Sequence, residues 1–175
     1  MSAGMTSFHV RPTARLTSAV VALALGLGLS PLAAADPPSR VARLNYVQGS
    51  VSFRPGGLND WVPATLNYPL TIGGDLWVDQ GARAELHIGS TALRLTPQTS
   101  FSFLNLDDRT VQIRLSQGSL IVRIQRIAAG EVFEVATPNG AVTLARPGSY
   151  RVDVDSDRVT TTVTIRRGEI GRAHV

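Results

Sequence analysis

Apolar and polar residues alternate along the chain from Val41 onward. An alternation with a period of two is the pattern of a β-strand that has one buried and one solvated face. No stretch of comparable length shows the period of about 3.6 residues that an amphipathic helix requires. We therefore predict strands at residues 44–46, 51–53, 84–88, 93–95, 101–103, 111–115, 120–124, 133–135, 142–144, 150–154 and 163–165.

Turn-forming residues separate these strands, mostly at intervals of about 8 to 12 residues. Pairs such as Gln117-Gly118 and Asn139-Gly140 suit turns, because glycine and asparagine tolerate a positive φ. Many short strands with regular turns predict an all-β fold of two packed antiparallel sheets, a β-sandwich or a jelly-roll-like arrangement. A β-solenoid-like stacking of the strands is the alternative.

The first 35 residues follow a different pattern. Arg11 and Arg15 precede an apolar run from Leu16 to Leu29, and the small residues Ala33-Ala34-Ala35 follow it. A basic start, a short apolar segment and small residues form a secretory signal peptide. The run has about 14 residues, fewer than the roughly 20 that a membrane-spanning helix needs. We expect cleavage before Asp36, a periplasmic or secreted protein, and no membrane span in its mature form.

The rest of the chain has the length of one ordinary domain, which we place at residues 36–169. Residues 170–175, with the sequence Ile-Gly-Arg-Ala-His-Val, match what a widely used sequencing adapter encodes in one reading frame. We therefore expect this tail to be non-native, and we leave it out of the fold prediction.

The charge of the chain is not that of a nucleic-acid-binding protein. The sequence has 17 basic residues against 13 acidic ones. Removal of the signal peptide takes Arg11 and Arg15 away, so 15 arginines remain against 13 acids and the net charge falls from +4 to +2. The arginines are also spread singly along the predicted strands and form no basic block. We expect no nucleic-acid partner.

Residues that several enzyme classes need are missing. The sequence has no Lys, which excludes a Walker-type phosphate loop and Schiff-base chemistry. It has no Cys, which excludes thiol nucleophiles, cysteine zinc sites and disulfides. Between the signal peptide and the tail, His87 is the only histidine, and no Gly-x-Ser-x-Gly motif accompanies it. We expect a protein that is not an enzyme and binds no cofactor.

One acidic segment has the spacing of the start of a calcium-binding loop. Its carboxylates are Asp153, Asp155 and Asp157. Arg158 and Thr164 stand where such a loop needs a glycine and a glutamate. We therefore expect an acidic turn at this position and no metal site.

Two groups of residues are candidates for binding a partner. The first is a set of arginines on the polar phase of their strands: Arg94, Arg114, Arg123 and Arg151. Alternation along the strands should place their side chains outward. Arginine is enriched at protein interfaces, so these residues are candidates for one partner surface. Solvated arginines without a binding role show the same pattern. The second group is aromatic: Trp61, Tyr68 and Trp77. These rings suit stacking on sugars, although aromatic residues more often belong to the core, because they carry a large apolar area.

An ordered series of motifs from Arg40 to about Val154 resembles the FecR-type periplasmic domain. The series covers most of the mature chain, which is similar to exported FecR-domain proteins of Gram-negative bacteria. Its segments are Val47-x-Gly49-x-Val51, Leu70-x-x-Gly73-Gly74-Asp75-Leu76, Gly81-x-Arg83-Ala84-x-Leu86-x-Ile88-Gly89, Pro97-x-Thr99-x-Phe101, Gly118-Ser119-Leu120, Thr137-Pro138-Asn139-Gly140-Ala141-Val142 and Pro147-Gly148-x-Tyr150-Arg151-Val152.

The resemblance implies an all-β periplasmic domain that contacts other proteins and has no catalytic residues. In the best-known members, this domain relays the state of an outer-membrane receptor to an anti-sigma region inside the cell. We expect a different layout here, because only about ten residues precede the expected signal, whereas a relay needs a cytoplasmic N-terminal domain. We expect an exported sensing or scaffolding module that binds another cell-envelope protein. The alternative is a module that binds envelope polysaccharide or peptidoglycan.

Overall fold

The computed structural model describes residues 40–174, with side chains as far as Gly171. The expected signal peptide and its cleavage site lie outside this part of the chain. Within it, strands are joined by turns and loops, and no helix is long and apolar enough to cross a membrane. The strands are β1 Ala42–Gln48, β2 Val51–Arg54, β3 Val62–Pro63, β4 Pro69–Leu70, β5 Asp75–Val78, β6 Arg83–Ile88, β7 Thr91–Leu95, β8 Thr99–Leu106, β9 Thr110–Ile124, β10 Val132–Thr137, β11 Gly140–Leu144, β12 Gly148–Val154, β13 Thr161–Arg167 and β14 Ile170–His174.

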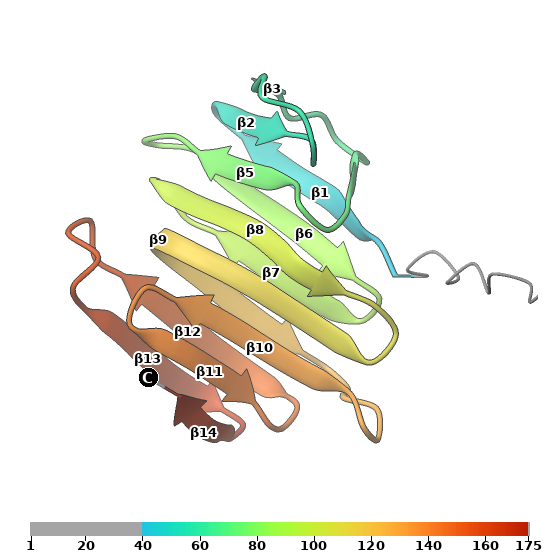
Figure 1. Cartoon of the computed structure of the whole chain (residues 1–175), viewed down its shortest axis with the longest axis vertical. Helices are drawn as coiled ribbons and strands as arrows, with labels where there is room; N and C mark the ends of the chain where they lie inside the picture. The colour runs from blue at the N-terminus through green and yellow to red at the C-terminus, as the bar shows by residue number, and fades with distance from the viewer. Residues whose placement is uncertain (1–39, 175) are drawn as a thin grey trace, which may run out of the picture. The chain divides into compact units, whose positions relative to one another are not determined.

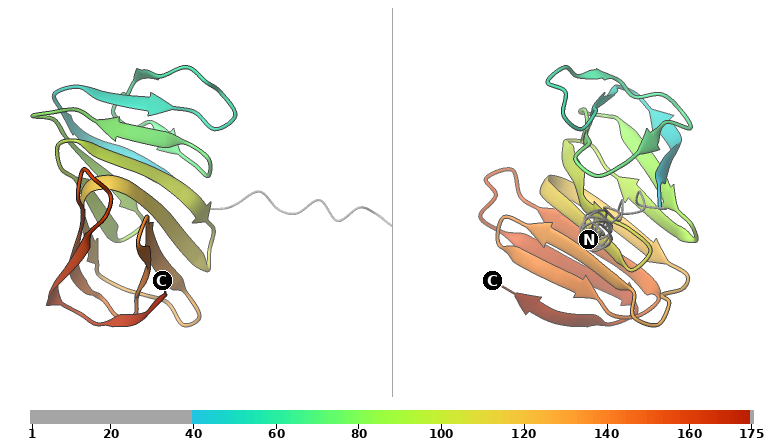
Figure 2. Two further views of the ribbon diagram at one scale, coloured as in Figure 1. Left: turned by 60° about the vertical axis from the view of Figure 1, so that its left-hand side comes forward. Right: turned by 45° about the vertical axis from the view of Figure 1, so that its right-hand side comes forward.

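The strands form two layers, which we call sheet A and sheet B (Figure 1, Figure 2). Sheet A has the strand order β4-β1-β6-β7-β9-β12-β13. Sheet B has the order β3-β2-β5-β8-β9-β10-β11-β14. Neighbouring strands run antiparallel, with β9 and β10 as the parallel exception. The prediction of an all-β, sandwich-like fold is confirmed, since a solenoid would stack its coils through parallel pairs.

Strand β9 belongs to both sheets. Its first half pairs with β8 in sheet B as far as Gln117, and its second half pairs with β7 and β12 in sheet A from Gly118 onward. Gly118 has a φ of 87°, in the region that favours glycine, and a Cβ there would collide with Thr99. The expectation of a turn between two separate strands at this point is wrong. The glycine instead bends one continuous strand from one layer into the other.

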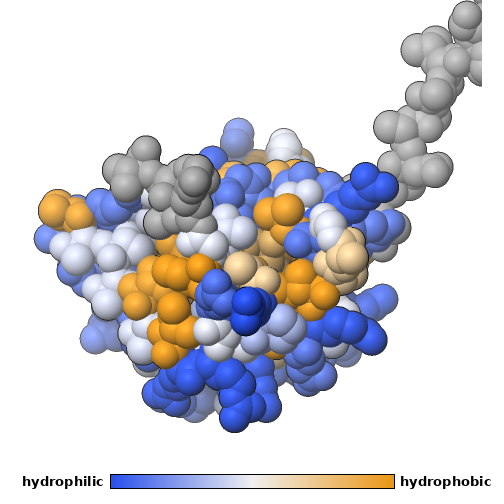
Figure 3. All heavy atoms as spheres, turned by 90° about the horizontal axis from the view of Figure 1, so that it is seen from below, coloured by the Kyte–Doolittle hydropathy of each residue, from blue (hydrophilic) through white to orange (hydrophobic). Residues whose placement is uncertain are grey.

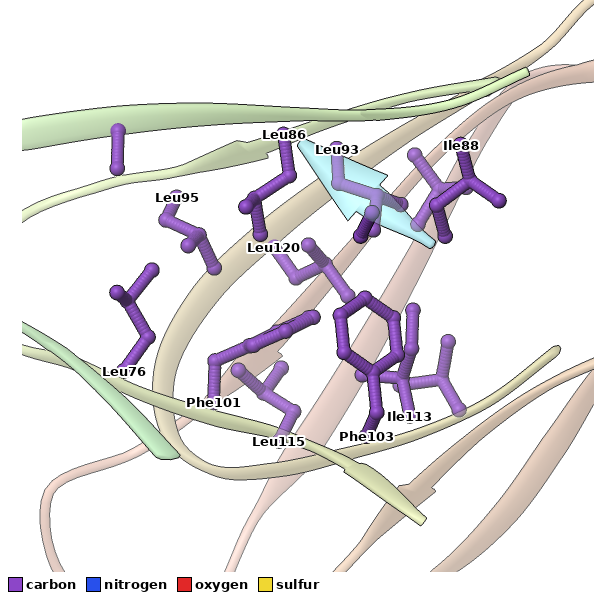
Figure 4. Close-up of a cluster of buried hydrophobic side chains, with 14 of the residues drawn as sticks. Leu76, Leu86, Ile88, Leu93, Leu95, Phe101, Phe103, Ile113, Leu115 and Leu120 are labelled. Carbon is purple, nitrogen blue, oxygen red and sulfur yellow. The ribbon is translucent and has the colours of Figure 1, made fainter. Parts of the chain in front are cut away.

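The core lies between the two sheets. Residues on the inward phase of the strands are buried, as the alternation predicted, and Leu86 and Leu93 of sheet A lie across from Phe101 of sheet B (Figure 4). The rings of Phe101 and Phe103 meet edge to face, with centroids 4.9 Å apart. Removal of this apolar surface from water is the main term that stabilises the domain. The other phase of each strand is left for the two outer faces.

The tail takes part in the fold. Residues Ile170–His174 form β14, which lies antiparallel to β11 with Ile170 beside Leu144. The side chain of Ile170 is half-buried against the core. The segment that was left out of the fold prediction therefore provides the edge strand of sheet B. Its non-native origin stays a prediction.

Candidate functional site

The outer face of sheet A brings several arginines together. At its centre, Arg123 of β9 lies between Ala92 of β7 and Ser149 of β12. Directly opposed residues on one face of a sheet are close enough to interact. Because both neighbours of Arg123 have small side chains, the space above them stays open.

The next row across the same strands has the opposite arrangement. Ile121 of β9 lies between Arg94 of β7 and Arg151 of β12. A half-buried isoleucine is thus flanked on both sides by a guanidinium. Alternation along the strands places Arg94, Arg123 and Arg151 on one outer face, and the strand order brings them together.

These two rows enclose a hollow of about 280 Å³, which we call the arginine hollow. Four arginines line it, together with Ala92, Ile121 and Ser149: Arg94, Arg123, Arg151 and Arg166. A second hollow of about 420 Å³ adjoins it and shares Arg94 and Ile121. The second hollow adds Tyr46 and Pro97, so an apolar surface continues from the charged one.

Two of the four arginines are already paired. Nε of Arg94 donates to Oε2 of Glu85 over 2.6 Å, and a terminal nitrogen of Arg151 lies 2.7 Å from Oδ1 of Asp153. Glu85 also lies 2.6 Å from Nε2 of His87, so the histidine belongs to the same group of contacts. Ion pairs this exposed contribute little to stability. Their effect is to hold the two arginines at the sides of the hollow.

The acidic partners stay ionised under these contacts. Burial acts to raise the pKa of Glu85, but the hydrogen bonds from Arg94 and His87 outweigh it and lower the pKa. Burial likewise acts to raise the pKa of Asp153, and hydrogen bonds from Arg151 and Ser119 lower it. Hydrogen bonds to the charged form of a carboxyl favour that form. Both carboxylates therefore remain charged in neutral solution.

The other two arginines carry uncompensated charge. Arg123 and Arg166 have no ion pair or hydrogen-bond partner among the side chains of residues 40–171. Both are exposed. A guanidinium presents several donors in a planar fork that matches a carboxylate. The arginine hollow is therefore suited to bind an acidic group from another molecule.

Arg114 does not belong to this site. It lies in the sheet B half of β9, opposite Ser102 of β8, so its side chain points from the other outer face of the domain. The four arginines selected from the sequence therefore do not form one surface. The physical reason is the bend at Gly118, which carries β9 from one layer to the other between Arg114 and Arg123.

The three aromatic candidates do not form one platform. Tyr68 packs inward on Phe53, with ring centroids 4.6 Å apart. Trp61 is 46% exposed and therefore does not belong to the core, and the guanidinium of Arg54 lies 5.1 Å from its ring. Trp77 is half-buried and donates from Nε1 to Asp79 over 2.7 Å. A sugar would meet at most the two tryptophans, and these lie apart. Trp61 directly precedes β3, Trp77 belongs to β5, and β2 lies between these two strands.

The expected acidic turn contains Asp155 and Asp157, whereas Asp153 lies within β12. Asp153 is held by Arg151 and Ser119 on the outer face of sheet A. Asp155 and Asp157 lie in the turn that leads into β13, where Arg158 has a positive φ. Among residues 40–174, no three or more acidic or histidine side chains are grouped so as to hold a metal ion.

Arg166 was not among the residues selected from the sequence. It follows Val163 and Ile165, whose phase places Arg166 on the polar side of its strand. The alternation that marked the other arginines therefore marks this one too. Its closeness to Arg123 and Arg151 could not be read from the sequence, because it depends on β13 lying beside β12.

Comparisons with known proteins give a limited result. No protein-family model matches the chain, and no curated protein matches it. Among solved structures, a candidate anti-sigma factor from Parabacteroides distasonis aligns at 18% sequence identity with a TM-score of 0.48. The alignment covers 55% of this chain and 45% of that one, so the chain spans less than half of the length of its structural neighbour. The FecR resemblance therefore rests on the sequence motifs, and the function has to be argued from the site.

Proposed function

We propose that the protein is an exported, non-enzymatic binding module of the FecR type that attaches to an acidic surface of another cell-envelope protein. The contact is made by the outer face of sheet A, with the arginine hollow at its centre. In this role the module is a scaffold or a sensor. Its state depends on whether the partner is bound at the arginine hollow. This role needs neither a cofactor nor a catalytic residue.

The observation that carries the proposal is the charge of the arginine hollow. Arg94 and Arg151 are held in place by Glu85 and Asp153, whereas Arg123 and Arg166 have no partner within the described domain. Arginine forms paired hydrogen bonds with carboxylates and is enriched at protein interfaces. The adjoining hollow adds the exposed ring of Tyr46 and the side chain of Ile121, which provide the apolar part of an interface.

The expected export supports the choice of a cell-envelope partner. The basic start, the apolar run and the alanine triplet of the first 35 residues are the basis for this location. The FecR-type motifs favour a protein partner over a small molecule. The polysaccharide alternative has less support, because Tyr68 packs on Phe53 and Arg54 lies against the ring of Trp61.

Capture of a partner from an envelope extract tests this function. The two unpaired arginines are replaced together, in the variant Arg123→Gln with Arg166→Gln, and the immobilised variant is compared with the unchanged domain. We expect capture to weaken by about tenfold, since each exposed charge contact contributes up to about 1 kcal/mol. The melting temperature should stay the same, because neither side chain has a partner within the described domain.

The matched control is Arg114→Gln with Arg109→Gln. It removes the same charge, and Arg114 lies on the same strand as Arg123 but on the outer face of sheet B. Capture by this control should be unchanged. Equal loss in both double variants would show an effect of net charge alone, and undiminished capture by Arg123→Gln with Arg166→Gln would exclude the arginine hollow as the contact.

A further inference from the structure

Strand β13 has a free edge. It pairs with β12 on one side and with no other strand of the described domain. In the turn before it, the amide of Asp155 donates to the carbonyl of Thr160. Hydrogen-bonded pairs alternate along an antiparallel ladder, so the backbone groups of Thr162 and Thr164 face β12. Those of residues 161, 163 and 165 therefore point away from the sheet.

The side chains of those same residues lie on the inward phase of sheet A. Thr161, Val163 and Ile165 are opposite Val154, Val152 and Tyr150, which are buried. Val163 is only half-buried, however, and Ile165 is 41% exposed. The core is thus incompletely covered at this end of the domain, where Figure 3 shows apolar side chains gathered between hydrophilic ones.

The outward phase of the same strand is basic at its end. Arg166 lines the arginine hollow, and Arg167 lies with Arg123 beside a further hollow of about 290 Å³. Neither Arg166 nor Arg167 has a side-chain partner within residues 40–171. A strand added to this edge would have one face toward apolar side chains and the other toward guanidinium groups.

Proteins usually protect a long free edge strand, because its unpaired backbone groups pair readily with another chain. Common protections are proline, lysine and very short strands. β13 is seven residues long, with the sequence Thr-Thr-Val-Thr-Ile-Arg-Arg. Its charged residues and its register shift against β12 lie at its end, so residues 161–165 contain neither a proline nor a charge. Its residue types favour strand pairing.

We propose that the partner binds by adding an extended segment to the free edge of β13, with apolar and acidic residues in alternation. The apolar residues lie over Val163 and Ile165, and the acidic residues pair with Arg166 beside the arginine hollow. Backbone hydrogen bonds to residues 161, 163 and 165 give the segment its register, as in other cases of strand addition. This inference rests on the proposed function and specifies how the partner is held.

A second copy of this chain fits the edge less well. β13 contains no acidic residue, so two β13 strands side by side offer no carboxylate to Arg166 or Arg167. Pairing of two β13 strands would also add the positive charges of a second Arg166 and Arg167 without any negative charge to neutralise them. The charge of the edge therefore favours a different, acidic strand.

Amide hydrogen exchange with a peptide probe tests the proposal on the whole domain. The probe is a blocked heptapeptide of alternating valine and glutamate, and the control peptide has lysine in place of glutamate. In the free domain, the amides of residues 162 and 164 should be protected and those of 161, 163 and 165 should exchange fast. We expect the glutamate peptide to slow exchange at 161, 163 and 165 at least tenfold and the lysine peptide to leave it unchanged.

Two variants separate the backbone contact from the charge contact. Val163→Pro removes the backbone N–H of residue 163, which faces the free edge. This N–H makes no hydrogen bond to β12, so the domain should still fold. It should abolish binding of the glutamate peptide. Arg166→Gln should weaken binding about threefold to tenfold and leave the fold intact. If Val163→Pro does not fold, the exchange pattern and Arg166→Gln still decide the matter.

Three results would overturn the inference. The first is peptide binding without protection at residues 161, 163 and 165, which would leave the arginine hollow as the docking site and the proposed function intact. The second is no binding of the glutamate peptide at millimolar concentration. The third is protection of the same amides in the free domain that increases with protein concentration, which would show that a second copy occupies the edge.

Discussion

Glu85 and Asp153 are the residues that set the geometry of the arginine hollow. Glu85 joins His87 and Arg94 across β6 and β7, and Asp153 joins Arg151 within β12. Each carboxylate is surrounded by donors, so its charged form is favoured. A guanidinium held in this way loses less side-chain freedom when a partner arrives, which benefits binding more than folding.

The lowered pKa values predict how stability depends on pH. Hydrogen bonds outweigh burial and lower the pKa of Glu85 below its ordinary value of 4.5 and that of Asp153 below 3.8. For groups with a lowered pKa in the folded state, the stabilisation is complete above the ordinary pKa and is lost as the pH falls through the lowered one. We expect Glu85→Gln with Asp153→Asn to cost about 1 kcal/mol or less at pH 7, and progressively less as the pH falls below the ordinary pKa of each carboxyl.

Denaturant unfolding of both proteins from pH 2 to pH 7 measures this difference. The control is Asp60→Asn, because Asp60 is exposed and takes part in no ion pair among the described residues. This control should change the free energy of unfolding little, because it removes no ion pair. A difference for the double variant that is constant over the pH range would contradict the prediction.

At the scale of elements, β9 decides the architecture. A single strand of fifteen residues is hydrogen-bonded in sheet B along its first half and in sheet A along its second. The change occurs at Gly118, where the amide of Ser119 donates to the hydroxyl of Thr99 over 3.1 Å. Close contact with Thr99 leaves no space for a side chain at this point. The bend therefore depends on glycine both for its φ and for its size.

We predict that Gly118→Ala destabilises the domain by about 3 kcal/mol. The change strains a residue with a φ of 87° and forces a Cβ against the backbone of Gln98 and Thr99. Thermal or denaturant unfolding measures the loss. Gly130→Ala is the matched control, since Gly130 has a φ of 79° but has nothing within 4 Å of the added Cβ. It should cost about 1 kcal/mol, from the backbone alone. Equal losses at both sites would show that close packing at Gly118 is unimportant.

At the scale of the whole domain, the two sheets share one core and one central strand. Buried side chains from both layers form a single cluster, and no part of residues 40–174 has a core of its own. A domain of this size with one core usually unfolds in a single step. The two tryptophans of the chain, Trp61 and Trp77, report on sheet B near β2 and β5.

We therefore expect fluorescence and far-ultraviolet circular dichroism to give the same unfolding curve. Val152 lies in β12 of sheet A, far in the strand order from the tryptophans of sheet B, and it is fully buried. Val152→Ala should therefore lower the free energy of unfolding by about 2 kcal/mol as reported by either probe. Val159→Ala should shift neither curve, because Val159 is 71% exposed. Separate transitions for the two probes would mean that the sheets unfold independently.

The sequence by itself determined most of the elements and the phase of the strands that it predicted, although it did not predict β3, β4, β5 or β14 and it divided β9 in two. Alternation depends only on neighbouring residues, so it identified β6, β7, β10 and β12 and correctly placed Arg94, Arg123 and Arg151 on the solvent side. It marked Arg166 in the same way. Turn residues likewise marked most strand ends, because their preference for a positive φ is local.

Only the tertiary structure decided which outward residues meet. Strand pairing is set by packing between segments far apart in the chain, and alternation contains no information about it. Gly118 has the local signature of a turn, but the core holds it as a bend inside β9, and this separates Arg114 from Arg123. The same pairing places β13 beside β12, so that Arg166 completes the arginine hollow and the edge of β13 stays free. A local pattern can show that a side chain points outward, whereas the order of strands in the sheets determines what it points toward.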